Sequence, residues 1–165
     1  MNYMFSWCEQ LTSLNVSNFN LENAISVSGM FQCCFNLKSI KLFYNTQTIE
    51  NMNSLFRHCY SLLSIDLSKF DTSNVKDMAY MFYECKVLTS IDLSNFITND
   101  NTIINYMFYY CYNLQFLNFS SFKGNYINYT NLFYKNSDIA CRIIVNENSP
   151  QNIRNIIPDN WIVEP

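Results

Sequence analysis

The sequence has little glycine, proline or charge. Of 165 residues, only 2 are glycine and 3 are proline, and charged residues make up 14%. Disorder requires low hydrophobicity and high net charge, whereas 49% of this chain is hydrophobic, so a folded protein is expected. The net charge is −3 without a basic stripe, so we expect no nucleic-acid partner. The 25 asparagines take the place of glycine at tight turns, because they tolerate left-handed backbone.

The sequence also lacks long apolar runs. None approaches the roughly 18 residues that a membrane-spanning helix needs, so no transmembrane segment is expected. The first residues, Met1 to Cys8, contain no basic region followed by an apolar stretch. This chain is therefore predicted to carry no secretory signal.

A pair of hydrophobic residues recurs every 25 or 26 residues. The pairs are Met4-Phe5, Met30-Phe31, Leu55-Phe56, Met81-Phe82, Met107-Phe108 and Leu132-Phe133. Four positions after the first member of each pair stand Cys8, Cys34, Cys59, Cys85, Cys111 and, at the sixth site, Asn136. Further apolar columns follow, the last of them phenylalanine except at Asn45. Residues 1–139 therefore contain about five and a half repeats.

Each repeat is expected to form a strand and a short helix. Residues 64–68 and 90–94 alternate polar and apolar side chains, which is typical of a half-buried strand. Residues 77–83 place Met78, Met81 and Phe82 at the spacing of one helical stripe. Stacked repeats would then share one core, with a parallel sheet on one side and short helices opposite.

These residues resemble a known family. The run from Met81 to Phe96 closely resembles the BspA-like leucine-rich repeat, in the 25-residue variety of bacterial surface proteins and lipoproteins, and residues 71–78 match its connecting loop. The resemblance covers roughly residues 1–139, with departures at residues 41–50 and 98–104. It implies an α/β repeat fold, a right-handed leucine-rich-repeat solenoid, and a role in adhesion or recognition. It also implies a cell-surface or secreted location, although a cytoplasmic location stays open because this chain carries no export signal.

The two ends differ in pattern. Residues 140–165 break the period and are expected to cap the solenoid with a strand at 142–145, a short helix at 150–157 and a closing strand at 161–163. The first coil has no such cap, so Leu11, Leu14 and Val16 are expected to lie at an open end. We favour a fragment of a longer protein; the alternative is end-to-end association through the uncapped first repeat.

The cysteine column is expected to belong to the core. Cysteines spaced by one repeat point in the same direction, which suits neither a tetrahedral zinc site nor a disulfide. Cys33 and Cys141 lie outside the column, and either is expected to be partly exposed. His58 precedes Cys59 without an orienting carboxylate, so a catalytic dyad is not expected. We therefore predict no enzyme activity, no metal site and no cofactor.

The outward side of the sheet is the first candidate binding surface. Strand alternation should expose three rows of side chains, the third of which includes Phe43. The candidate binding residues are Ser64, Asp66, Ser68, Ser90, Asp92, Ser94, Phe116 and Asn118. The alternative is that these short polar side chains only keep the sheet soluble.

A tyrosine cluster is the second candidate. Of 12 tyrosines, seven lie between residues 106 and 134. The candidates are Tyr106, Tyr109, Tyr110 and Tyr112, with Tyr126, Tyr129 and Tyr134 nearby. Exposed tyrosines favour protein or glycan contacts, but these rings could instead stack on each other. The leading hypothesis is a recognition or adhesion module with a macromolecular partner, protein or glycan; the alternative is a structural spacer of a larger surface repeat protein.

Overall fold

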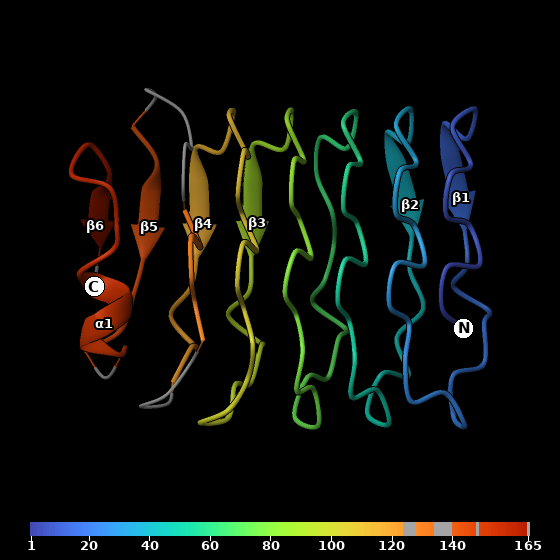
Figure 1. The fold of residues 1–165 in the computed structure, drawn as a ribbon, viewed down its shortest axis with the longest axis horizontal. Helices are drawn as coiled ribbons and strands as arrows, with labels where there is room; N and C mark the ends of the chain where they lie inside the picture. Colours follow the sequence, from blue (N-terminus) through green and yellow to red (C-terminus); the bar gives the residue numbers. More distant parts are fainter. Residues whose placement is uncertain (124–127, 134–139, 148, 165) are drawn as a thin grey trace.

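The computed structural model describes residues 1–123, 128–133, 140–147 and 149–164. The chain winds into a parallel-strand β-solenoid of about five turns. Figure 1 shows the coils side by side, from the N-terminus at one end to the C-terminus at the other. The repeat architecture predicted from the hydrophobic columns is therefore confirmed.

One layer of the solenoid consists of short parallel strands. β1 (Ser13–Asn15) pairs with β2 (Ser39–Lys41) in a two-stranded sheet. A second sheet has the order β3 (Ser90–Asp92), β4 (Phe116–Asn118), β5 (Arg142–Ile144) and β6 (Ile162–Glu164). The register aligns Ser13 with Ser39 and Asp92 with Asn118, as the repeat spacing predicts.

The predicted single sheet is interrupted between β2 and β3. Residues 62–67 form no strand, although an alternating pattern predicts one at 64–68. In the preceding coil, Phe43 is 1% exposed and stacks on Phe70 with ring centroids 5.6 Å apart. The prediction that Phe43 faces outward was wrong. Phe43 occupies the core place that the repeat assigns to Asn45, two residues further along the chain. The backbone of this coil therefore leaves the strand layer two residues early.

The opposite layer is built from turns, and the short helix predicted over 77–83 is not formed there. Met81 N–H donates to the Met78 carbonyl at 3.3 Å, and Cys85 N–H donates to the Phe82 carbonyl at 3.0 Å. Tyr80 and Glu84 have φ of 59° and 57°, which a helix does not contain. Within the described residues, the one helix is α1 (Gln151–Arg154).

The turns replace a helix because alternate backbone N–H groups bond to the next coil. Met78, Tyr80, Phe82 and Glu84 donate to carbonyls of residues 103, 105, 107 and 109 at 2.8 to 3.0 Å. A helix would use the same N–H groups within its own segment. Parallel bridges between Ser26, Asn51, Asp77, Ile103 and Asn128 begin this turn layer in successive coils.

The core lies between the two layers and repeats from coil to coil. The phenylalanines of the hydrophobic pairs stack at 5.5 to 5.8 Å in the column Phe31, Phe56, Phe82 and Phe108. The column cysteines from Cys34 to Cys111 are fully buried, and each thiol donates to the carbonyl of a phenylalanine in the preceding coil at 3.1 to 3.2 Å. Burial raises the pKa of Cys34 to about 11. The prediction that these cysteines belong to the core is confirmed.

One detail of the cysteine prediction was wrong. Cys33 and Cys141 are both buried, although they lie outside the column. All seven cysteines are free thiols. Asn136, at the sixth column position, lies outside the described residues.

The terminal coils differ from the middle coils, although Val16, which was predicted to lie at the open end, is 1% exposed. β5, α1 and β6 follow one another at the C-terminal end, and buried Trp161 packs on Phe133 with ring centroids 5.0 Å apart. In the first coil, Tyr3, Met4 and Trp7 are exposed. Among the described residues, no helix has the length and apolar character to cross a membrane.

Candidate functional site

The richest cluster of interacting side chains lies on the outer side of the turn layer. We call this surface the turn face and define it by the outward residues of segments 57–60, 80–86 and 106–112. The hydrophobic pair within each segment, or just before it in the case of Leu55-Phe56, points into the core, and the outward residues that follow the pair are mostly only partly buried. Because successive segments are in register, equivalent outward positions lie next to one another.

Two rows of tyrosines stack across neighbouring coils of the turn face. Tyr80 and Tyr106 lie 5.0 Å apart with an interplanar angle of 4°. Tyr83 and Tyr109 lie 5.1 Å apart with an angle of 3°. Equal repeat positions bring like rings together, so each row presents ring edges rather than ring faces to solvent.

Two cations lie over aromatic rings of the turn face. The guanidinium carbon of Arg57 lies 5.2 Å from the ring centre of Tyr80 and 4.9 Å from that of Tyr83. The ammonium of Lys86 lies 4.1 Å from the ring centre of Tyr60. All three distances fall within the range of attractive cation–π contacts.

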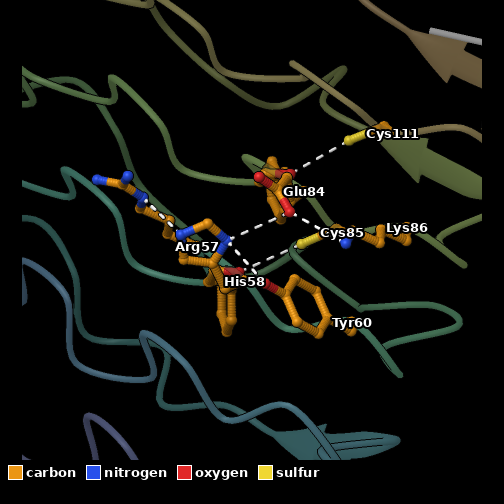
Figure 2. Close-up of polar contacts among 9 residues, drawn as sticks. Arg57, His58, Tyr60, Glu84, Cys85, Lys86 and Cys111 are labelled. Carbon is orange, nitrogen blue, oxygen red and sulfur yellow. Dashed lines mark hydrogen bonds and ion pairs between the residues drawn. The ribbon is translucent and has the colours of Figure 1, made fainter.

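His58 and Glu84 connect the two cations, as Figure 2 shows. Arg57 Nε donates to His58 Nε2 at 3.2 Å. Glu84 Oε2 lies 3.7 Å from His58 Nδ1 and 3.1 Å from Lys86 Nζ. Desolvation by burial lowers the pKa of His58; the Glu84 carboxylate opposes this shift, while Arg57 and Lys86 add to it.

The strand face holds the first predicted set, and the structure brings four of its members together. Asp66, Ser68, Asp92 and Ser94 line a shallow pocket of about 220 Å³. Ser64 and Ser90 are exposed in the neighbouring row, whereas Phe116 is half-buried beneath the Arg142 guanidinium. Arg142 is itself paired with Glu164 through two bonds of 2.9 Å.

The aspartates of this pocket already have a structural role. Asp66 Oδ1 accepts the Ser68 backbone N–H at 3.0 Å, and Asp92 Oδ1 accepts that of Ser94 at 2.9 Å. Asn118 makes the same bond to Ser120. Hydrogen bonds from Ser68 lower the pKa of Asp66. At positions 66, 92 and 118 this row therefore accepts the N–H of the turn that follows, a role that Asp and Asn share.

The chain was compared with known protein families. The model of the family described as "Mycoplasma protein of unknown function, DUF285" matches residues 1–60 and 34–143. The chain belongs to this DUF285 family. The match is consistent with the BspA-like resemblance of the repeats, whereas the leucine-rich-repeat class stays a prediction. No curated protein and no solved structure matches the chain significantly.

The second predicted set lies within the DUF285 repeats, on the turn face. Tyr106, Tyr109 and Tyr110 are half-buried, and Tyr112 is 42% exposed. Tyr110 packs edge-on against Tyr109 at 4.3 Å and lies 5.3 Å from Tyr112. The rings thus stack on each other and still form one surface. Tyr129 is half-buried, and Tyr126 and Tyr134 lie outside the described residues.

Several residues of the DUF285 turn face were missed by sequence reasoning. They are Arg57, Tyr60, Tyr80, Tyr83 and Lys86. The repeat columns carried the signal, because 57, 83 and 109 are equivalent positions, as are 60, 86 and 112. The prediction considered the density of tyrosines along the chain and not their repeat columns, so it overlooked the side chains of the neighbouring coils. Within the described residues, no group of three or more His, Cys, Asp or Glu side chains could hold a metal ion.

The His58 site predicts a pH dependence of stability in this DUF285 chain. A histidine whose pKa is lowered by folding binds a proton more readily when unfolded, so stability should fall as pH drops through about 6.5. We expect the melting temperature of the wild type to fall more between pH 7.5 and pH 5.5 than that of His58→Asn. Asparagine tolerates the φ of 62° at this position and does not titrate. Equal losses in the two proteins, measured by circular dichroism, would contradict the prediction.

Proposed function

We propose that the chain is a non-enzymatic recognition or adhesion module that binds a macromolecular partner, protein or glycan, through the turn face. The observation that carries the proposal is the tyrosine and cation cluster that spans segments 57–60, 80–86 and 106–112. Tyrosine and arginine dominate the energetic centres of protein interfaces. Here Tyr80, Tyr83 and Arg57 are held by ring stacking and cation–π contacts, so little side-chain entropy is lost on binding.

The strand face is the weaker candidate for the contact surface. Its aspartates serve as acceptors for turn N–H groups, and its pocket is shallow. Solubility of the sheet and formation of the turns are enough to explain short polar side chains on this face. We therefore assign the partner to the turn face.

We also propose a right-handed leucine-rich-repeat class and a cell-surface or secreted location. Both rest on the resemblance of residues 81–96 to BspA-like repeats, which the DUF285 match accompanies. The second candidate function is a structural spacer. The continuous Phe31–Phe108 stack favours it, because a solenoid with one uninterrupted core is stiff along its axis.

A binding array distinguishes the module from the spacer. The chain would be applied to immobilised glycans and surface proteins as wild type, as Tyr80→Ala/Tyr83→Ala and as Asp66→Asn/Asp92→Asn. Asparagine keeps the turn acceptor, as Asn118 shows, and removes only the charge. We expect at least one ligand whose affinity falls about tenfold or more in the tyrosine variant and stays within about twofold in the aspartate variant.

The other outcomes of the array contradict the proposal in separate ways. A loss confined to the aspartate variant would place the contact on the strand face. Binding to no member of the array would favour the spacer. Circular dichroism of each variant shows whether a loss of binding reflects a loss of fold.

A further inference from the structure

The structure assigns a partner chemistry to the turn face: we infer that it binds an acidic peptide segment, with Arg57 as the bidentate anchor for a carboxylate. This inference rests on the proposed recognition function. It begins from the charge pairing of the cations. Lys76, Lys86 and Arg142 are paired with Glu50, Glu84 and Glu164. Arg57 has no carboxylate within 4.0 Å among the described residues.

Arg57 is nevertheless held in one position. Its Nε donates to His58 Nε2, and its guanidinium plane lies near Tyr80 and Tyr83. Figure 2 shows the outer end of the guanidinium pointing away from His58 and from the other labelled residues. A planar guanidinium with its terminal amino groups open matches the two oxygens of a carboxylate. Among the described residues, the lysines that form no ion pair are exposed and have no such aromatic support: Lys38, Lys41, Lys69 and Lys123.

The open surface favours a peptide over a sugar. Stacking of a sugar on an aromatic ring needs an open ring face. The faces of Tyr80 and Tyr83 are covered by Arg57 from the preceding coil and by Tyr106 and Tyr109 from the following coil. What remains accessible of Tyr80 and Tyr83 is their ring edges and hydroxyl groups. These suit an extended chain that carries hydrogen-bonding groups and carboxylates at intervals.

His58 sets the orientation of the anchor. Its Nε2 accepts the Arg57 bond only while that nitrogen carries no proton. Glu84, Lys86, Tyr60 and Tyr83 surround the ring from the same and the neighbouring coil. The neutral ring therefore holds the guanidinium through Nε and leaves its terminal amino groups for a ligand.

The test uses a fluorescein-labelled peptide of alternating Glu and Gly, its Gln–Gly counterpart, and a labelled heparin oligosaccharide. Fluorescence anisotropy would compare the wild type with Arg57→Gln and Arg57→Lys. Lys69→Gln is the matched control, since it removes one positive charge from an exposed strand-face residue. We expect the Glu peptide to bind the wild type and the Gln peptide to bind at least about tenfold more weakly. Arg57→Gln and Arg57→Lys should each lose about tenfold or more, and Lys69→Gln less than twofold.

Each other outcome overturns a defined claim. Absence of Glu-peptide binding to the wild type, or equal losses in Arg57→Gln and Lys69→Gln, would refute the inference. Full retention in Arg57→Lys would refute the bidentate contact. Arg57-dependent binding of heparin without peptide binding would replace the peptide by a glycan and leave the recognition function intact. An array ligand that depends on Tyr80 and Tyr83 but binds Arg57→Gln as tightly as the wild type would refute the role of Arg57 and leave the recognition function intact. Failure of both array and peptide would remove both proposals.

Discussion

Replacement of Phe82 by alanine is expected to lower the free energy of unfolding by about 3–5 kcal/mol. Phe82 is fully buried and lies at the centre of the phenylalanine column, 5.7 Å from Phe56 and 5.8 Å from Phe108. Its backbone N–H bonds to the Met107 carbonyl at 3.0 Å, which fixes the ring between its two neighbours. Because each coil contacts only the coils beside it, a cavity here breaks the core into two shorter stacks.

Urea unfolding followed by circular dichroism would measure this loss. Phe82→Leu retains most of the volume and should lose substantially less than Phe82→Ala. Tyr44→Ala is the surface control, because Tyr44 is 54% exposed, and it should change the free energy by less than about 0.5 kcal/mol. A loss in Phe82→Ala as small as that of Tyr44→Ala would show that the column does not hold the coils together.

The sequence predicted the solenoid because the core repeats with the chain. Cys85, Leu88 and Leu93 each have a counterpart one repeat before and one repeat after. All three are buried, as are these counterparts. The parallel direction and register of the strands follow from the same spacing. Stacking brings equivalent positions of successive repeats into contact, so a column of apolar residues in the sequence predicts tertiary contacts.

The turn layer could not be predicted from periodicity. Met78, Met81 and Phe82 have helical spacing, yet they line one side of a series of turns. A pattern of inward residues records only which side chains face the core, not where the backbone N–H groups donate. Those of Tyr80 and Glu84 bond to the next coil, a choice that depends on a neighbour 25 residues away. Phe43 was misplaced for a similar reason, because a shift of two residues cannot be read from one coil alone.

The candidate site was predicted only in part. Tyr106 and Tyr109 were found from local tyrosine density, but Arg57 was not, because its importance comes from lying over Tyr80 and Tyr83 of the next coil. Conversely, Asp66 stood out as a charge on the strand face, and its hydrogen bond to Ser68 shows a local structural use. The outward position of Arg57 holds Tyr83 in the next coil, so a change of residue type hid this contact, and it required the structure.

A threonine ladder, also missed in the sequence, gives the second large expected effect. Thr72 Oγ1 accepts the Ile97 backbone N–H at 2.7 Å and donates to the Ile97 carbonyl at 3.0 Å. Thr46 and Thr98 make the same pair of bonds to Asp71 and Lys123 in their own next coils. Thr72 is fully buried, so its hydroxyl is shielded from water and has the two backbone groups of Ile97 as its partners.

Thr72→Val keeps the shape of the side chain and removes both bonds. Leaving a buried donor or acceptor unsatisfied costs about 1–3 kcal/mol, so we expect the free energy of unfolding to fall by about 2–4 kcal/mol. Thr72→Ser retains the hydroxyl and should recover most of this loss. Thr12→Val is the matched control, because Thr12 is exposed, and it should change stability by less than about 0.5 kcal/mol.

Hydrogen exchange locates the effect of Thr72→Val. The Ile97 amide should exchange faster in this variant, because its acceptor is gone, whereas the Asp71 amide, which bonds to Thr46, should keep most of its protection. If stability falls while the exchange rate of the Ile97 amide is unchanged, the valine acts through packing. If Thr72→Val unfolds at the same urea concentration as Thr12→Val, the ladder contributes nothing to the stacking of the coils. The expected result would instead show that the solenoid is held along its edge by hydroxyl bonds as well as through its phenylalanine core.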